Sequence, residues 1–506
     1  MKLQEIPWVI AQAGGKGTRL KHYTWNKPKC LLSIASQPLL YHLFSHFPDS
    51  NFLVIGDYSY EVLDKYLQVF PPKVSVQLIQ AKTKGTISGI DQALSYIPEN
   101  NPFLLVWCDL LFEDIPDCKI EGKNWIGLSR SFPCRWSYDD TGNCLEEASS
   151  ERGIAGFFVF HNKTVLKDIP SSGECVRWFA QKSIQFNELF LDHTYEFGTQ
   201  EHIAEYQKQR PVNRFFNSVE IVGDQVIKKA RIPEFETLIE REINWYRNAH
   251  SLGFNHLPTL ISDQPMTISR ITGVHPFELE VSYQQKREIL SDIFQTLNKL
   301  HSCDRKQANA KTLIEVYLQK TYNRVNSVAQ LIPHFEKPTI QVNGCLCRNP
   351  FHSQYENLIS QLVAEIQVDN FMLIHGDPTF SNILVDNQDK VWLIDPRGYF
   401  GSSWLYGDPL YDWAKLYYSV VGDYDSFNRR RFQLKIIDQQ VDISIESNGW
   451  QDLESMFVEK FANQIFVIRL LHSLIWLSLS GYVKDDYDSI LASFYNGLFW
   501  LEDVLK

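Results

Sequence analysis

The stretch WVIAQAGGKGTRL, Trp8 to Leu20, decides the expected fold of the first part of the chain. Its first six residues form the apolar run of a short buried strand, and glycines and basic residues follow directly. Glycine allows backbone N–H groups to approach phosphate oxygens closely. In open α/β sheets, ligands bind beyond the carboxyl ends of the strands. The stretch therefore predicts a phosphate site at the end of a first strand.

Strand and helix patterns alternate after this loop. Apolar runs predict strands at 51–57, 74–80 and 101–109, and amphipathic patterns predict helices at 37–47, 60–70 and 86–97. The alternation predicts an α/β fold with a Rossmann-like, mostly parallel sheet covered by helices. Asp109 ends the last of these strands, so we expect it at the same rim of the sheet as the glycine loop.

The spacing in the loop excludes two common phosphate-binding motifs. A P-loop needs Gly-Lys-Ser/Thr, whereas Lys16 is followed by Gly17. A dinucleotide fingerprint needs a third glycine or alanine, but that position holds Leu20. The loop still offers backbone N–H donors, and Arg19 and the later Lys29 add two cations. Such a set is suited to the charge that builds on a triphosphate during in-line displacement.

These residues resemble the GGxGxRL and downstream PK signature of the sugar-phosphate nucleotidyltransferase family. Three further segments appear in the family's order: KGTISGIDQAL at 84–94, WCD at 107–109 and EFGTQEHI at 196–203. The resemblance covers about residues 7–205. It implies transfer of a nucleoside monophosphate from an NTP to a phosphate acceptor, with release of pyrophosphate and with Mg²⁺ as the metal.

The resemblance also implies roles for individual residues. Arg19 and Lys29 are expected to be catalytic, and Asp109 and Glu196 to hold Mg²⁺. The family has Asp at the second metal position, and Glu196 keeps a carboxylate there for a cation that prefers oxygen ligands. The residues expected to contact the nucleotide are Gly14, Gly15, Lys16, Gly17, Thr18, Gly85 and Thr86.

The acceptor side of this domain departs from the family pattern. Gly153 and Gly156 resemble a glycine-containing substrate strand, so both are candidate substrate-binding residues. Many members also carry a Glu-Lys-Pro segment that grips a sugar phosphate. The corresponding stretch here, CLEEASSERGIAGFFVF at 144–160, has no such lysine. The identity of the acceptor therefore stays open.

A second motif, FMLIHGDPTFSNILV, occupies residues 371–385. Its HGD triplet ends at Asp377, Asn382 follows after four residues, and Asp395 ends a later apolar run. This is the spacing of a kinase catalytic loop, in which the first Asp accepts the hydroxyl proton and the other two residues hold Mg²⁺ on ATP. These segments resemble the aminoglycoside phosphotransferase and choline kinase family over about residues 215–420.

This second resemblance implies a protein-kinase-like α+β domain and further site residues. Lys228 is expected to pair with Glu242 beside the nucleotide, and Lys229 is the alternative if the strand register is off by one. Arg397 is a candidate contact to phosphate or substrate, with a structural ion pair as the alternative. From about residue 283 onward, we expect helices to dominate, interrupted by the segment 371–397.

The length of 506 residues exceeds one ordinary core. A polar, proline-containing segment at 204–215 marks the expected boundary, which gives a nucleotidyltransferase domain at 1–208 and a phosphotransferase domain at 209–506. The net charge of −11 argues against nucleic acid and anionic membranes as partners. Nine scattered cysteines and an N-terminus without an apolar signal region favour a cytoplasmic protein without membrane insertion. The oligomeric state is not indicated.

Together the two domains predict a bifunctional enzyme. The C-terminal domain would phosphorylate a small hydroxyl compound with ATP, and the N-terminal domain would join that phosphate to a nucleoside monophosphate from a second NTP, expected to be CTP or UTP. The product would be a nucleotide-activated precursor for a surface polysaccharide such as a capsule. A sugar is the favoured acceptor. Choline or an amino alcohol with CTP is one alternative, and a single active domain beside a regulatory or binding module is another.

Overall fold

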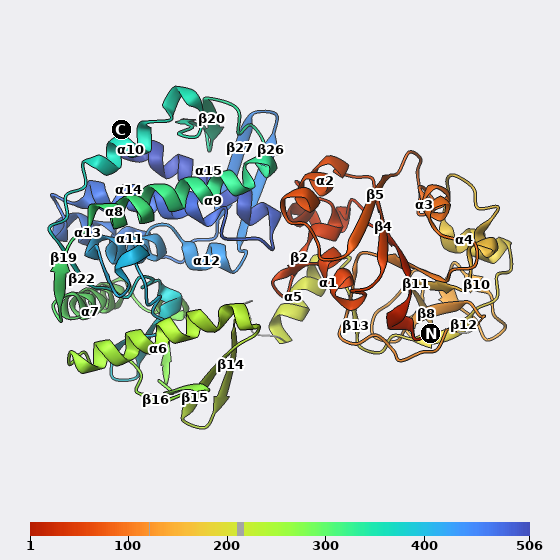
Figure 1. Cartoon of the computed structure of the whole chain (residues 1–506), viewed down its shortest axis with the longest axis horizontal. Coiled ribbons are helices and arrows are strands. Elements are labelled where there is room, and N and C mark those ends of the chain that lie inside the picture. Colours follow the sequence, from red (N-terminus) through yellow and green to blue (C-terminus); the bar gives the residue numbers. More distant parts are fainter. Residues whose placement is uncertain (121, 210–216) are drawn as a thin grey trace. The chain divides into compact units, whose positions relative to one another are not determined.

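The computed structural model describes residues 1–120, 122–209 and 217–506 (Figure 1). The chain separates into two compact units, Met1–Val212 with Lys484–Tyr487, and Asn213–Val483 with Asp488–Lys506. The expected boundary between residues 208 and 209 stays a prediction, since the segment that follows it, 210–216, lies outside the described residues. Among the helices of the described part, none has the length and apolarity needed to cross a membrane.

Four parallel strands form the centre of the first unit, in the order β6-β1-β4-β5. They are β1 (Trp8–Gln12), β4 (Asn51–Gly56), β5 (Ser75–Gln80) and β6 (Phe103–Trp107). The helices between and after them are α1 (Leu39–His46), α2 (Tyr60–Val69), α3 (Ile90–Tyr96), α4 (Cys175–Gln181) and α5 (Gln200–Gln209). The expected α/β class with a mostly parallel sheet is confirmed.

Antiparallel strands extend this sheet beyond β6. The long strand β11 (Gly153–Phe160) pairs with β6 and with β8 (Trp125–Ser129), and β12 (Asn187–Phe190) runs parallel to β8. Two short strands, β9 (Ser137–Tyr138) and β10 (Cys144–Leu145), complete the nine-stranded sheet. A two-stranded ribbon lies outside it, formed by β2 (Ser33–Ile34) and β3 (Gln37–Pro38).

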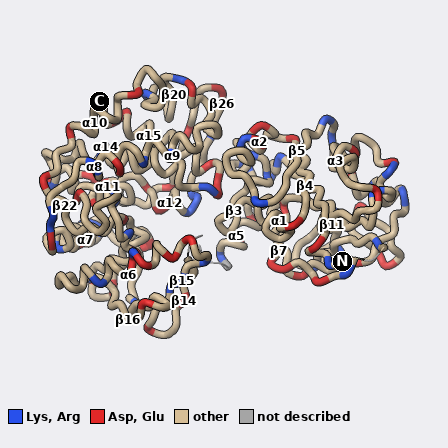
Figure 2. Tube along the Cα trace, viewed as in Figure 1, with Lys and Arg blue, Asp and Glu red and all other residues tan. Residues whose placement is uncertain are grey.

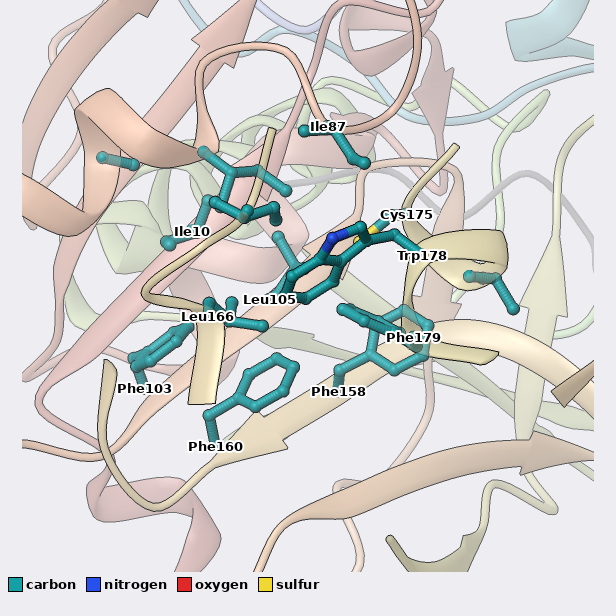
Figure 3. Packing of buried hydrophobic residues seen from close by; sticks show 14 of the residues in the cluster. Ile10, Ile87, Phe103, Leu105, Phe158, Phe160, Leu166, Cys175, Trp178 and Phe179 are labelled. Atoms are coloured by element: carbon teal, nitrogen blue, oxygen red, sulfur yellow. The ribbon is translucent and has the colours of Figure 1, made fainter. Parts of the chain in front are cut away.

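The apolar character of the central strands comes from burial on both faces, which parallel strands usually have. Val9, Ile10 and Ala11 of β1 are all fully buried. One core cluster joins Ile10 and Leu105 of the sheet to Phe179 of α4, and Figure 3 shows these side chains with Phe103, Phe158 and Trp178 around them. This core fixes the carboxyl ends of β1 and β6, from which the candidate site is built.

A small antiparallel ribbon positions Glu196, the second of the two expected metal ligands. Strand β13 (Thr194–Glu196) pairs with β7 (Leu110–Phe112), with Glu196 opposite Leu110. The backbone N–H of Phe197 also donates to the carbonyl of Asp109 at 3.0 Å. Because β7 follows β6 almost directly, this pairing brings Glu196 next to Asp109 across a long stretch of chain.

The second unit begins with a four-stranded antiparallel sheet in the order β14-β15-β17-β16. Its strands are β14 (Asn217–Val222), β15 (Gln225–Ala230), β16 (Leu260–Asp263) and β17 (Met266–Ser269), and helix α6 (Glu236–Ser251) packs on β15 and β16. Two three-stranded sheets follow. They contain β18 (Gly273–Val274), β23 (Ile383–Asp386) and β24 (Val391–Leu393), and β19 (Arg305–Gln307), β22 (Asn370–Leu373) and β25 (Tyr406–Gly407).

Helices make up most of the remaining part of this unit. They are α7 (Tyr283–His301), α8 (Ala310–Leu313), α9 (Lys320–Val328), α10 (Leu358–Ala364), α11 (Pro409–Val420), α12 (Tyr424–Asn428), α13 (Glu454–Lys460), α14 (Ile465–Leu479) and α15 (Tyr487–Val504). Helices thus dominate from 283 onward as expected, but the sequence did not predict one further sheet, in the order β21-β20-β27-β26. Its strands are β20 (Thr339–Val342), β21 (Cys345–Arg348), β26 (Phe432–Ile437) and β27 (Gln440–Ile445).

Candidate active sites

The first unit contains a cleft of about 450 Å³ at the carboxyl ends of β1, β4 and β6. Six of the residues expected at the site line it: Gly14, Gly15, Lys29, Gly85, Thr86 and Asp109. The position agrees with the rule that ligands of open α/β sheets bind outside the carboxyl ends of the strands.

A lysine and two carboxylates meet at one end of this cleft. The Nζ of Lys29 lies 2.6 Å from Oδ2 of Asp109 and 3.6 Å from Oε1 of Glu196. His202 fixes the second carboxylate, because its Nδ1 lies 2.8 Å from Oε2 of Glu196. The other oxygen of Asp109, Oδ1, is buried and has no hydrogen-bond partner within the described residues.

These two carboxylates fit a magnesium site. Mg²⁺ is commonly held by one or two carboxylates, while water and substrate phosphates complete its octahedron. Asp109 and Glu196 supply such a pair, and both lie near the same ammonium group. Within the described part of the chain, no group of three or more His, Cys, Asp or Glu side chains could hold a metal by itself. The remaining ligands would therefore have to come from the nucleotide and water.

Glycines open this cleft where side chains would close it. A Cβ on Gly14 would lie 2.7 Å from Cβ of Asp57, and one on Gly85 would lie 2.3 Å from the carbonyl oxygen of Gly173. Gly85 also has φ +97°, a conformation that side chains rarely adopt. Gly15 has open space around it, as expected for backbone that a ligand approaches.

The other expected residues of this unit lie around the cleft rather than in its wall. Lys16, Thr18 and Arg19 are exposed, with the ammonium of Lys16 over the ring of Tyr58 at 5.2 Å. Gly17 turns the chain in a left-handed conformation with φ +62°. The remaining two expected residues, Gly153 and Gly156, lie in β11 and are not among the lining residues.

The sequence did not single out several side chains that line the cleft. Trp107 Nε1 and Gln12 Oε1 are buried without a hydrogen-bond partner in the described structure, and both residues line the cleft. Gly156 makes room for the indole, because a Cβ there would lie 2.1 Å from ring atoms of Trp107. Asp57 follows the end of β4, and the strand-end rule that selected Asp109 could have found it.

Arg135 is a further lining residue that sequence reasoning missed. It lies in an irregular segment with no motif around it. Its Nη2 is 2.6 Å from Oε1 of Glu146, which also binds Arg177 at 2.7 Å. Glu146, in the stretch that lacks the family's lysine, thus lies between Arg135 and Arg177, and Arg135 lines the cleft.

In the second unit, a buried lysine joins a helix to the end of a strand hairpin. Lys228 of β15 lies 2.5 Å from Oε1 of Glu242 on α6 and also forms an ion pair with Asp395. Burial would lower the pKa of Lys228, but the charges of Asp395 and Glu242 outweigh it and raise the pKa. The side chain of Lys229, the register alternative, is exposed. Lys228 is therefore the lysine that the strand directs inward.

The loop after β22 carries the expected acceptor of the hydroxyl proton. Asn382 Nδ2 donates to the carbonyl of Asp377 at 2.8 Å and to its Oδ2 at 3.2 Å. Lys415 of α11 lies 2.9 Å from Oδ1 of Asp377. Burial would raise the pKa of Asp377, but Lys415 and Arg397 hold it below its usual value, so the group is a carboxylate at neutral pH.

A fully buried aspartate braces this loop. Asp412 of α11 accepts the backbone N–H groups of His375 at 2.8 Å and Gly376 at 2.7 Å, and its Oδ2 lies 3.0 Å from Nε2 of His301. His375 Nε2 contacts the carbonyl of Ile394 at 3.0 Å, and burial lowers the pKa of His375. His375 thus ties the Asp377 loop to the strand end that carries Asp395.

Arg397 does not form an ion pair within the described residues. Its backbone N–H donates to the carbonyl of His375 at 2.9 Å, and its guanidinium donates to the hydroxyls of Tyr399 at 2.7 Å and Tyr411 at 3.4 Å. Of the two possibilities left open by the sequence, the structural ion pair is therefore absent here, and the guanidinium lies beside the catalytic loop.

Comparisons with known proteins agree with this division of chemistry. Residues 9–116 match the family model of the MobA-like NTP transferase domain, and residues 213–439 match that of the phosphotransferase enzyme family. Both resemblances stated from the motifs are confirmed. The chain thus contains a nucleotidyltransferase domain followed by a phosphotransferase domain, and both matched families are transferases by description.

The curated relatives match between about a fifth and a third of the chain. The bifunctional protein GlmU of Methanococcus maripaludis strain C7 is 29% identical over 125 residues, which are 24% of this chain and 29% of the relative. The mannose-1-phosphate guanylyltransferase catalytic subunit beta of Drosophila pseudoobscura pseudoobscura is 28% identical over 186 residues, 32% of this chain and 49% of the relative. The chain thus spans between about a quarter and a half of the length of these relatives.

Solved structures similar to this chain include the inositol-1-phosphate CTP transferase from T. maritima, with 16% identity and a TM-score of 0.32 over 40% of this chain and 97% of that one. HddC from Yersinia pseudotuberculosis, complexed with GMP-PN, has 21% identity and a TM-score of 0.34 over 40% of this chain and 99% of that one.

Proposed function

We propose that the chain is a bifunctional enzyme that makes a nucleotide-activated compound in two steps. The second unit transfers the γ-phosphoryl group of ATP to a hydroxyl of a small molecule. The first unit then lets that phosphate attack the α-phosphorus of a second NTP, which releases pyrophosphate. The observation that carries the proposal is the presence of two separate sets of a cation with carboxylates, Lys29 with Asp109 and Lys228 with Asp395.

In the first step, Asp377 is the acceptor of the hydroxyl proton. Its carboxylate is ionised and oriented by Asn382 and Lys415, which suits a general base. Lys228 would hold phosphate oxygens of ATP in the place where it now meets Asp395. Mg²⁺ on Asn382 and Asp395 would neutralise charge on the phosphates. The brace on Asp412 keeps the base in position.

In the second step, the glycine loop supplies backbone donors to the triphosphate, and Lys29 and Arg19 counter the charge that develops at the α-phosphorus. Mg²⁺ held by Asp109 and Glu196 would add to this neutralisation. The exposed loop residues Lys16 and Thr18 would contact the triphosphate once it is bound. The nucleobase would lie near Gly85 and Thr86, beside the free polar atoms of Gln12 and Trp107.

Several observations support a phosphorylated sugar as the acceptor in this second step. One curated relative of this unit is named for mannose 1-phosphate. Arg135 lines the cleft and offers a cation for the incoming phosphate, where the family's lysine is missing. Gly153 and Gly156 pack against Cys134 and Trp107, so we propose that their strand reaches the acceptor through the Trp107 indole that lines the cleft. We further propose CTP or UTP as the second NTP, a cytoplasmic location and a role in supplying a surface polysaccharide.

Mass spectrometry of reactions with ATP, Mg²⁺, each common NTP and a pool of sugars tests the proposal. The expected result is an acceptor phosphate with ATP alone, and a nucleotide-linked product with pyrophosphate when the second NTP is added. If a nucleotide-linked product forms from a supplied sugar phosphate but ATP phosphorylates no acceptor, only the first unit is active. If ATP phosphorylates an acceptor but no pyrophosphate is released, only the second unit is active. Release of neither product with any combination would refute the proposal.

A further inference from the structure

A group of basic side chains lies beside Asp377 in the second unit. Lys320 and Arg324 come from α9, Arg397 follows the end of β24, and Lys415 comes from α11. Elsewhere on the two units, basic and acidic residues are interspersed along the chain, as Figure 2 shows. We call Lys320, Arg324, Arg397 and Lys415 the cationic cluster.

Tyrosine hydroxyls, rather than carboxylates, bind two members of the cationic cluster, Arg397 and Lys320. The hydroxyl of Tyr411 accepts from Arg397 at 3.4 Å and from Lys320 at 3.3 Å. Arg397 also donates to Tyr399 at 2.7 Å, and Arg324 lies over the ring of Tyr482 at 5.0 Å. The polar ends of Arg397 and Lys320 therefore converge on the hydroxyl of Tyr411, while Arg324 donates to the carbonyl of Ser478 at 3.4 Å.

The cluster carries more positive charge than its surroundings neutralise. Lys415 pairs with Asp377, but within the described residues no carboxylate forms an ion pair with Lys320, Arg324 or Arg397. Buried or half-buried cations without a counter-charge are costly, so such an excess is typical of a site that receives an anion. The field is strong enough to act on a phenol: burial would raise the pKa of Tyr411, but Lys320, Lys415 and Arg397 lower it to about 7.

We propose that the hydroxyl compound phosphorylated at Asp377 carries its own negative charge, a carboxylate or a phosphate, which Arg397 and Lys320 bind. This inference rests on the proposed phosphotransferase function and names its substrate class. A guanidinium can hold a carboxylate or phosphate through two parallel hydrogen bonds, and the ammonium adds a point charge. Both groups lie next to the residues that hold Asp377, so the anion would be bound close to the reacting hydroxyl.

The same cluster disfavours the choline or amino-alcohol alternative. A quaternary or primary ammonium at this place would meet three cations that have no carboxylate partner in the described structure. Like charges brought together in a partly desolvated site repel each other more strongly than in water. An acidic sugar or a sugar that already bears a phosphate would instead replace the phenol oxygens as the partner of Arg397.

Matched acceptors test the charge preference without any substitution. Phosphoryl transfer from ATP is measured on the full chain with glucose, glucuronate, glucose 6-phosphate, glucosamine and choline. We expect kcat/KM for at least one of the two anionic compounds to exceed that for glucose at least tenfold, with glucosamine and choline lowest. Glucuronate and glucose 6-phosphate distinguish a carboxylate from a phosphate as the bound group.

Two substitutions test the named residues. Arg397→Met and Lys320→Met are expected to raise KM for the anionic acceptor at least tenfold and to leave KM for ATP within twofold. Lys306→Met is the matched control, because Lys306 lies over the ring of Tyr406 at 3.8 Å in β19 and is not part of the cluster. It should change neither KM.

The remaining outcomes decide against either the preference for an anionic acceptor or the phosphotransferase function. Preference for glucose, glucosamine or choline would overturn the inference and leave the phosphotransferase proposal intact. A rise in KM for ATP alone would assign the cluster to the nucleotide and would also overturn it. If no acceptor is phosphorylated, the proposed function fails, and calorimetric titration with glucuronate, glucose 6-phosphate and glucose decides the inference: selective binding of an anion supports it, and equal or absent binding refutes it.

Discussion

The ammonium of Lys29 lies 2.6 Å from the carboxylate of Asp109, although 80 residues separate the two in the chain. Lys29 begins a short 3-10 helix, Lys29–Leu31, downstream of the glycine loop, and Asp109 follows the end of β6. Glu196 completes the group from a third segment, at 3.6 Å from the same ammonium. The nucleotidyltransferase site is therefore made by the sheet topology, and its chemistry should be separable from that of the second unit.

Removing one carboxylate from each unit tests this separation. Asp109→Asn should lower nucleotidyl transfer from a supplied sugar phosphate by about 100-fold or more, because a charged metal ligand is lost, and should leave ATP-dependent phosphorylation within twofold. Asp377→Asn should do the reverse. Steady-state assays of both activities on both variants give the answer. Loss of both activities in a variant that remains folded by circular dichroism would contradict independent sites.

The pairing of Lys228 predicts a sharp difference between neighbouring lysines. Lys228→Met leaves Glu242 and Asp395 without their shared cation and should lower kcat/KM for ATP by about 100-fold, because the cation proposed to hold the phosphate oxygens is lost. Lys229→Met is the matched control, because its side chain is exposed on the same strand. A larger effect of Lys229→Met would mean that the site uses the other register, and equal effects would contradict the role assigned to Lys228.

The close packing of Gly156 against Trp107 predicts that adding one methyl group at this position strongly lowers the free energy of unfolding. Gly156→Ala places a Cβ 2.1 Å from the indole at a position with φ +81°, and we expect the free energy of unfolding to fall by about 2–4 kcal/mol. Nucleotide affinity should fall as well, because Trp107 lines the cleft. Denaturant unfolding and equilibrium dialysis measure the two effects.

Gly223 offers the control for this substitution. It has φ +57°, but a Cβ there would meet nothing within 4 Å. Gly223→Ala should therefore cost only the backbone strain, about 1–2 kcal/mol, and should not affect nucleotide binding. A similar loss of nucleotide affinity in both variants would show that packing against Trp107 is not what shapes the cleft.

Arg135 should act on the acceptor of the first unit and not on its NTP. Arg135→Met is expected to raise KM for the sugar phosphate by about tenfold, the effect of one lost charge-assisted hydrogen bond, with little change in KM for the NTP. Arg130→Met is a suitable comparison, since Arg130 lies over the ring of Phe190 at 3.6 Å and does not line the cleft. A rise in KM for the NTP instead would assign Arg135 to the triphosphate.

The acceptor site of the second unit should weaken as the pH rises. Burial lowers the pKa of Lys320 to about 8, and the pKa of Tyr411 is lowered to about 7. Between pH 6.5 and 8.5, Tyr411 gains a negative charge and Lys320 loses its positive one, so both changes disfavour a bound anion. The other charged or titratable groups facing them are Arg324, Arg397, Tyr399, Lys415 and Asp377.

We therefore expect KM for glucuronate, whose own charge is constant in this range, to rise at least tenfold per lost unit of charge, because two unit charges about 4 Å apart near a protein surface interact by several kcal/mol. Tyr411→Phe should remove the part of the rise centred near pH 7. The measurement is KM for glucuronate and for ATP at intervals of half a pH unit. A flat profile for glucuronate in the wild-type protein would contradict the charge argument.

The sequence predicted the parts of the fold that have strong local patterns. The alternation from Trp8 to Asp109 gave all four central strands, because each is an apolar run bounded by polar turns. The strands at 339–348 and 432–445 were missed. They are four to six residues long and pair β20 with β27 across about a hundred residues, and no local signal reports such a pairing.

The candidate site shows the same limit. Motifs indicated Lys29, Asp109 and Asp377, whose spacing is tied to a turn or strand end. They could not indicate Trp107 as a lining side chain, because its place depends on the missing side chain at Gly156 in a different strand. Nor could they indicate Arg135, which enters the cleft from an irregular segment.

The short ribbon of β7 and β13 has a practical consequence for anyone shortening this protein. The family match of the first unit ends at residue 116, yet Glu196 and its partner His202 come from well beyond that point. A fragment cut at the end of the match would keep the glycine loop, Lys29 and Asp109, but it would carry half of the acidic pair. Such a fragment would also lack β11 and α4, whose side chains complete the core around the central strands, so it should neither fold stably nor transfer a nucleotide. The minimal unit for activity studies must therefore extend through α5.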